Sequence, residues 1–151
     1  MIPVPPLPDL QLPVPWTADA LHRRHHAQDL LIASETEEYL VRLERCAAGR
    51  LRETYPVALH DLELQADTCA TEFLPELLSV VTGALNSTDP LCRRLVLAIS
   101  TDAPSRAVAA ATAGFRHVVD VDLGGAEHGL FTWEPSWVTR IDPDLDRVPD
   151  V

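Results

Sequence analysis

The chain contains no lysine and only six glycines in 151 residues. Its 12 basic residues are all arginines, they face 23 acidic residues, and the formal net charge at pH 7 is −11. No basic stripe interrupts this excess of negative charge, which repels phosphate backbones and anionic lipid surfaces. We therefore expect the protein to bind neither nucleic acid nor a membrane surface.

Cysteine is also scarce. Cys46, Cys69 and Cys92 are odd in number, widely spaced and without a Cys-x-x-Cys pair, so neither a disulfide framework nor a zinc site is indicated. His22 and His26 stand four residues apart, which would place them on one face of a helix, but no third ligand follows at a fixed spacing. A solvated helix face is favoured over a metal site, and no metal is expected.

Long apolar runs are absent as well. None approaches the roughly 18 residues that a membrane-spanning helix needs, and no charged and then apolar leader opens the sequence. The sequence therefore predicts a soluble, cytoplasmic protein. Its length predicts one domain, because 151 residues with 46% hydrophobic content suffice for a single core.

Proline marks the boundaries of that domain. Residues 1–16 contain six prolines among valine, leucine and isoleucine, which predicts an extended arm, since proline removes a backbone donor and fixes φ. An arm packed along its own domain or a neighbouring subunit is favoured over a ligand for an aromatic groove. The domain itself is expected over 17–137, and residues 138–151, where Asp and Pro alternate, form an acidic tail.

The first third of the chain carries helix signals. Thr17 can cap a helix that begins at Ala18, and a second helix over 34–48 is predicted from the capping-box pattern between Ser34 and Glu37. Gly49 would end that second helix.

The remainder of the chain alternates strand and helix patterns. A continuous apolar run predicts a strand covered on both faces, and strict alternation predicts a half-buried one. The alanine-rich helix that follows the central strand can lie close to a sheet, and Gly114 ends it. The expected elements are strands at 55–64, 95–99, 118–123 and 130–133, and helices at 73–85 and 105–113.

This order of elements, with its Ala113–Arg116 (Ala-Gly-Phe-Arg) helix end, resembles the C-terminal half of the GCN5-related N-acetyltransferase (GNAT) family. With the Leu77–Val81 helix and the Ser87–Pro90 connection, it is most similar to the siderophore-type acyltransferases. The resemblance implies an α/β (α+β) fold with a mixed, mostly antiparallel sheet flanked by helices. Because little sequence lies between Gly49 and Tyr55, a reduced strand count is expected, or a homo-oligomer or partner chain that completes the sheet.

The resemblance also implies chemistry. The co-substrate would be acetyl-CoA or another acyl-CoA, bound at Thr71, Ile99 and Ser105, and the acceptor a small-molecule amine or hydroxylamine. His60 approximately matches the catalytic histidine of the siderophore-type members, and Asp102 falls close to their acidic or asparagine position. A neutral imidazole suits proton removal from the acceptor. The alternatives are an ordinary strand histidine at position 60 and a plain helix cap at position 102.

Two features depart from the family. Its pyrophosphate loop carries glycines that let the backbone wrap the phosphates, but the matching stretch here, 67–73, has no glycine, no arginine and two carboxylates. Ala110 stands where many members have a tyrosine acid. Two hypotheses follow: an N-acyltransferase that uses acyl-CoA, or a catalytically inactive protein of the same fold that serves as a binding or assembly module.

Overall fold

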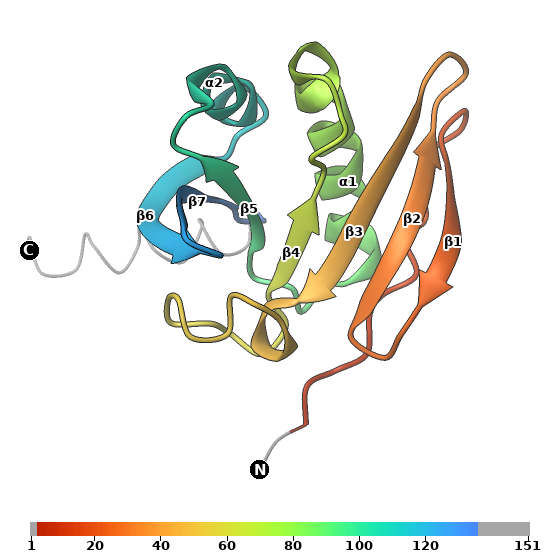
Figure 1. The fold of residues 1–151 in the computed structure, drawn as a ribbon. Coiled ribbons are helices and arrows are strands. Elements are labelled where there is room, and N and C mark those ends of the chain that lie inside the picture. Colours follow the sequence, from red (N-terminus) through yellow and green to blue (C-terminus); the bar gives the residue numbers. More distant parts are fainter. Residues whose placement is uncertain (1–2, 136–151) are drawn as a thin grey trace, which may run out of the picture.

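The computed structural model of the protein describes residues 3–135, so the acidic tail predicted at 138–151 lies outside the described residues. These residues form one seven-stranded sheet with two α-helices, and the sheet order is β1-β2-β3-β4-β5-β7-β6 (Figure 1). Every neighbouring pair of strands is antiparallel except β4 and β5, which are parallel. The strands are β1 (Thr17–Arg23), β2 (Ala27–Ala33), β3 (Glu38–Arg45), β4 (Leu62–Gln65), β5 (Leu95–Ser100), β6 (Arg116–Leu123) and β7 (Ala126–Trp133).

The first third of the chain is a three-stranded meander, and both helices predicted there are wrong. β1 and β2 occupy the first predicted helix, so His22 lies on a strand and His26 in the following turn. β3 and a short 3-10 turn, Cys46–Ala48, occupy the second. The Ser34 hydroxyl accepts a hydrogen bond from the Glu37 amide at 3.0 Å, but it closes the β2–β3 hairpin rather than a helix end.

The strand count follows from this correction. The expectation of a reduced sheet is wrong, because the strands thought to be missing are the residues assigned to helices. The predicted strand at 55–64 is shorter than expected: β4 begins only at Leu62, after a turn. The helix predicted at 73–85 is α1 (Leu74–Thr88), and the one at 105–113 is α2 (Pro104–Thr112). β7 lies between β5 and β6 in the sheet. The strands predicted at 95–99 and 118–123 are therefore not direct neighbours, because both pair with β7.

The main core lies on one face of the sheet, which we call the inner face. α1 runs behind β3 and β4, and α2 stands beyond the end of β5 (Figure 1). Leu7 and Leu10 of the N-terminal arm join the core that α1 and the sheet form. Its fully buried members include Ile32, Leu43, Leu62, Leu64, Leu77, Leu78 and Leu95.

The opposite, outer face carries a second, smaller core. The segment between β3 and β4 passes under β5, β7 and β6 (Figure 1) and buries Cys46 and Leu51 against Val96 and Leu130. In the part of the chain that the structure describes, no helix has both the length and the apolar character to cross a membrane.

Candidate functional site

The two parallel strands at the centre of the sheet separate soon after they meet. β4 and β5 pair only at Leu62 with Leu95 and at Glu63 with Val96. Beyond these positions the outer edges remain paired, β4 with β3 and β5 with β7, while the two inner edges diverge (Figure 1). Backbone N–H and C=O groups there are not used in a ladder, so an extended ligand with amide groups can pair with them.

A loop without glycine stands at the open end of these strands. It follows β4 directly and runs to α1 through a 3-10 turn, Thr71–Phe73. Arg106, in the first turn of α2, donates hydrogen bonds to the carbonyls of Ala66 at 2.9 Å and Cys69 at 2.7 Å. The side chain therefore joins the β5 side of the opening to the β4 side.

The three residues predicted to bind a cofactor lie at this end of the sheet. Thr71 begins the 3-10 turn before α1, Ile99 is buried near the end of β5, and Ser105 is exposed in the first turn of α2. α2 also contacts the 3-10 turn that Thr71 begins. Their binding role remains a prediction.

The two predicted catalytic residues lie at opposite ends of the sheet. His60 is in the turn before β4, whereas Asp102 follows β5, and the six residues of β5 separate the two levels by roughly 17 Å. They cannot act as a pair on one substrate, although each role alone stays a prediction. Asp102 is also not the cap of α2: Ala103 occupies that position, and no side chain caps the helix.

A buried carboxylate beside the divergence was not predicted from the sequence. Glu63, on the outer face of β4, is 1% exposed and lies between Glu44 of β3 and Val96 of β5. Arg50, from the segment beneath the sheet, holds it through two nitrogens, with Nη2 at 2.7 Å and Nε at 3.2 Å from Oε2. The signal that could have found it is a glutamate between two leucines in a central strand, because a charge at such a position requires a partner.

The electrostatic surroundings of Glu63 favour proton uptake. Burial raises the pKa of its carboxyl above the ordinary value, Arg50 lowers that pKa through its hydrogen bonds, and the negative charges of Glu44 and Asp67 raise it further. The net direction is upward. A raised carboxyl pKa is what a general base needs to work near neutral pH.

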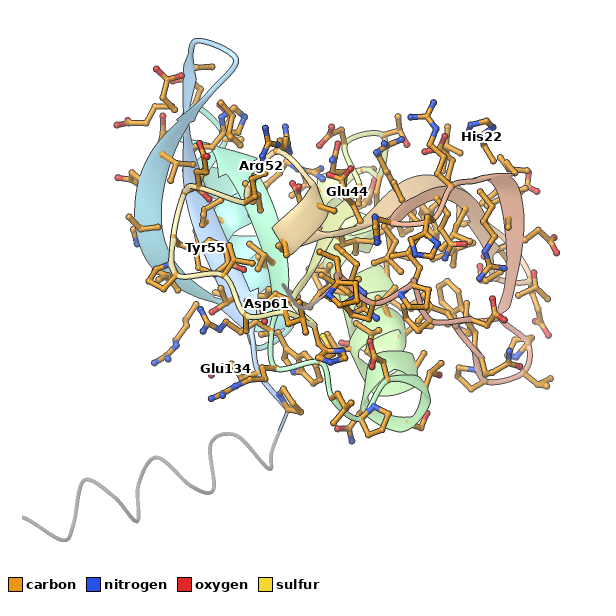
Figure 2. The ribbon with its side chains drawn as sticks, turned by 90° about the horizontal axis from the view of Figure 1, so that it is seen from below. His22, Glu44, Arg52, Tyr55, Asp61 and Glu134 are labelled. Atoms are coloured by element: carbon orange, nitrogen blue, oxygen red, sulfur yellow. The ribbon has the colours of Figure 1, made fainter. Side chains whose placement is uncertain are left out.

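A second buried carboxylate holds the segment beneath the sheet. Asp61 is fully buried, and its Oδ2 accepts hydrogen bonds from the Tyr55 hydroxyl at 2.9 Å and the Ala58 amide at 3.0 Å. Arg94 Nε is 3.7 Å from the same oxygen. Figure 2 shows the Tyr55 and Asp61 side chains close to one another on this segment. Burial is the main reason that the pKa of Asp61 is raised.

The raised pKa of Asp61 predicts how its removal changes stability with pH. A carboxyl whose pKa is higher in the folded state costs stability as pH rises from its unfolded to its folded pKa. As pH rises through that range, we expect Asp61→Asn to lose less stability than the wild type, because the asparagine side chain does not ionise. Urea unfolding at intervals from pH 4 to 8 measures this slope. Identical slopes in the two proteins would contradict the assignment, and Asp102→Asn, at an exposed position, is the control.

Comparisons with known proteins bear on the fold. No protein-family model matches the sequence, and neither does any curated protein. An uncharacterised protein from Bacillus halodurans superposes with a TM-score of 0.64 at 14% identity, over 78% of this chain and 64% of that one. The aminoglycoside acetyltransferase AAC(6')-Ib, in complex with coenzyme A and kanamycin, gives a TM-score of 0.61 at 11% identity, over 76% and 70% of the two chains.

A spermidine N-acetyltransferase chimera from Vibrio cholerae and hSSAT gives a TM-score of 0.50 at 12% identity, over 76% of this chain and 70% of that one. At these identities the likeness defines the fold. The chain has the fold of the GCN5-related N-acetyltransferases, and this part of the prediction is confirmed. The likeness extends beyond the second half of the chain, and the siderophore-type sub-family remains a prediction.

Proposed function

We propose that this domain is an N-acyltransferase that moves an acyl group from acyl-CoA to a small-molecule amine. One observation carries the proposal: β4 and β5 separate after two paired positions, and the buried Glu63 stands beside that separation. The free inner edges supply hydrogen-bonding groups for the two amides of a pantetheine arm. Glu63, on the outer face, supplies a base at the level where the strands part.

In the proposed reaction the amine nitrogen attacks the carbonyl carbon of the thioester. The new carbon–nitrogen bond forms, the carbon–sulfur bond breaks, and the sulfur leaves with the electron pair as a thiolate. The Glu63 carboxylate takes the proton that the nitrogen must lose. Solvent protonates the thiolate, because Ala110, at the position of the family's tyrosine, is buried and carries no acid.

The charge around Glu63 favours a cationic acceptor. Glu44 lies directly across from Glu63 on β3, Asp67 raises its pKa through space, and the whole chain has a net charge of −11. Arg50 already places one cation against Glu63, and its side chain is 40% exposed. An ammonium group can replace that guanidinium when Arg50 turns outward to solvent. Kanamycin, bound to the aminoglycoside acetyltransferase, is consistent with an amine acceptor.

The inactive binding module remains the second candidate. The observation that favours it is the loop after β4, which has no glycine and directs two carbonyls at Arg106. Glycines let a backbone wrap closely around a pyrophosphate, and a loop without them disfavours that mode of binding.

Ligand binding decides between these two functions. We expect acetyl-CoA at millimolar concentration to raise the melting temperature, because a ligand that binds only the folded state stabilises it. The measurement is a thermal-shift series with acetyl-CoA, a longer acyl-CoA and free adenosine diphosphate as the control, followed by isothermal titration. No shift and no heat with either thioester would reject the transferase and leave the binding module.

A further inference from the structure

The opening between β4 and β5 contains one cation without a carboxylate partner. Among residues 3–135, no carboxylate lies within 4.0 Å of the Arg106 guanidinium, whereas Arg45 and Arg50 both form ion pairs. The two carboxylates on the adjacent loop, Asp67 and Glu72, are exposed and make no ion pair with it. Within residues 3–135 this guanidinium therefore has no counter-charge, and an anionic ligand can supply one.

The hydrogen bonds of Arg106 fix its position but leave most of its guanidinium N–H groups free. Its two carbonyl acceptors, those of Ala66 and Cys69, take two of the five N–H groups of the guanidinium. Ala66 follows the last residue of β4, and α2 follows β5 after a short turn. The guanidinium thus spans the mouth of the opening with N–H groups to spare. Two fixed bonds also reduce the rotamer freedom that a ligand would otherwise have to restrict.

We propose that Arg106 binds the diphosphate of the acyl-CoA donor and so replaces the glycine amides that the loop lacks. The inference rests on the proposed function and specifies its donor site. A planar guanidinium fork matches phosphate oxygens in a bidentate manner and keeps its charge at any physiological pH. Thr71 and Ser105, the residues predicted from the family resemblance, lie on the 3-10 turn and in the first turn of α2, the two elements next to this loop.

The proposal separates two parts of the donor. The diphosphate meets Arg106 at the mouth, and the pantetheine arm meets the strand edges within the opening. Loss of the guanidinium should therefore weaken binding of a ligand that carries the diphosphate and leave binding of a ligand without phosphate unchanged. A residue that only shapes the loop would affect both ligands alike.

The test is isothermal titration of coenzyme A and of pantetheine into the wild type, Arg106→Ala and Arg106→Lys. We expect Arg106→Ala to raise the Kd of coenzyme A roughly 10-fold or more and to leave that of pantetheine unchanged. Arg106→Lys should fall between, because lysine keeps the charge without the fork. Arg93→Ala, exposed and before the opposite end of β5, removes an equal charge and should change neither constant.

Each contrary outcome has its own meaning. Equal affinity of the wild type and Arg106→Ala for coenzyme A, or equal weakening of both ligands, overturns the role of Arg106 and leaves the transferase intact. Binding of coenzyme A by Arg106→Ala but not by the wild type shows that the guanidinium blocks the opening, and again overturns only this inference. Failure of every variant and the wild type to bind either ligand rejects the proposed function itself.

Discussion

Replacement of Glu63 by glutamine is expected to lower kcat by about 100- to 10,000-fold, the usual contribution of a positioned general base. The amide cannot take the proton from the acceptor nitrogen, while its size and its contacts with the sheet are retained. The protein should stay folded, because Arg50 is 40% exposed and can turn to solvent when its partner loses its charge. Steady-state kinetics with acetyl-CoA and a polyamine or aminoglycoside acceptor measures the effect.

Glu44→Gln provides the matched control. Glu44 lies opposite Glu63 on β3, has a side chain that is 15% exposed, and is 3.6 Å from Arg42. The same chemical change there should alter KM for a cationic acceptor more than kcat. Equal losses of kcat in both variants would show that negative charge in general, rather than proton transfer at Glu63, supports the reaction.

Arg50→Ala distinguishes proton transfer from binding through the pH profile. The hydrogen bonds from Arg50 lower the pKa of Glu63, so their loss raises that pKa. A base works only when it is deprotonated, and the acidic limb of the kcat profile should therefore move to higher pH. An unmoved limb would exclude Glu63 as the titrating base. His60→Ala in the same assay tests the histidine predicted from the sequence.

The second half of the fold could be predicted because its signals are local. Leu95–Ile99 is an apolar run of strand length, and Gly114 follows α2 with φ of 94°, which glycine adopts at little cost. The first third was predicted wrongly because one set of apolar residues fits both the two-residue period of a strand and the 3.6-residue period of a helix. Tyr39, Val41 and Leu43 alternate into the core as a strand, yet Tyr39 and Leu43 are also four apart, as on a helix.

The candidate site could not be predicted in the same way. Arg50 and Glu63 are 13 positions apart and meet only because the segment between them folds under the sheet. Arg106 reaches a loop about 40 positions earlier. Such contacts depend on which strands pair, and local patterns do not fix strand pairing. Thr71, Ile99 and Ser105 were named through the family resemblance rather than from local patterns. They lie at one end of the sheet, and their binding role stays a prediction.

Replacement of Arg45 by methionine is expected to destabilise the protein by about 3–5 kcal/mol, the range for removal of one partner of a buried ion pair. The Arg45 side chain is 3% exposed and lies 3.0 Å from Asp89 Oδ2, at the end of α1. It also donates to the carbonyl of Pro6 in the arm at 2.7 Å and to that of His60 at 2.7 Å. Methionine fills a similar volume but leaves the two carbonyls without this donor and the Asp89 carboxylate without its counter-charge.

This arginine joins three segments: the arm, the turn before β4 and the end of α1. Arg42→Met is the matched control, because Arg42 is on the same strand but faces outward, is 32% exposed and forms longer ion pairs with Asp29 and Glu44. Its loss should cost at most about 1 kcal/mol. Urea unfolding measures both variants, and limited proteolysis of the arm, residues 3–16, reports whether it is released. A loss below about 1 kcal/mol for Arg45→Met, with the arm still protected, would show that apolar packing alone holds the arm to the sheet.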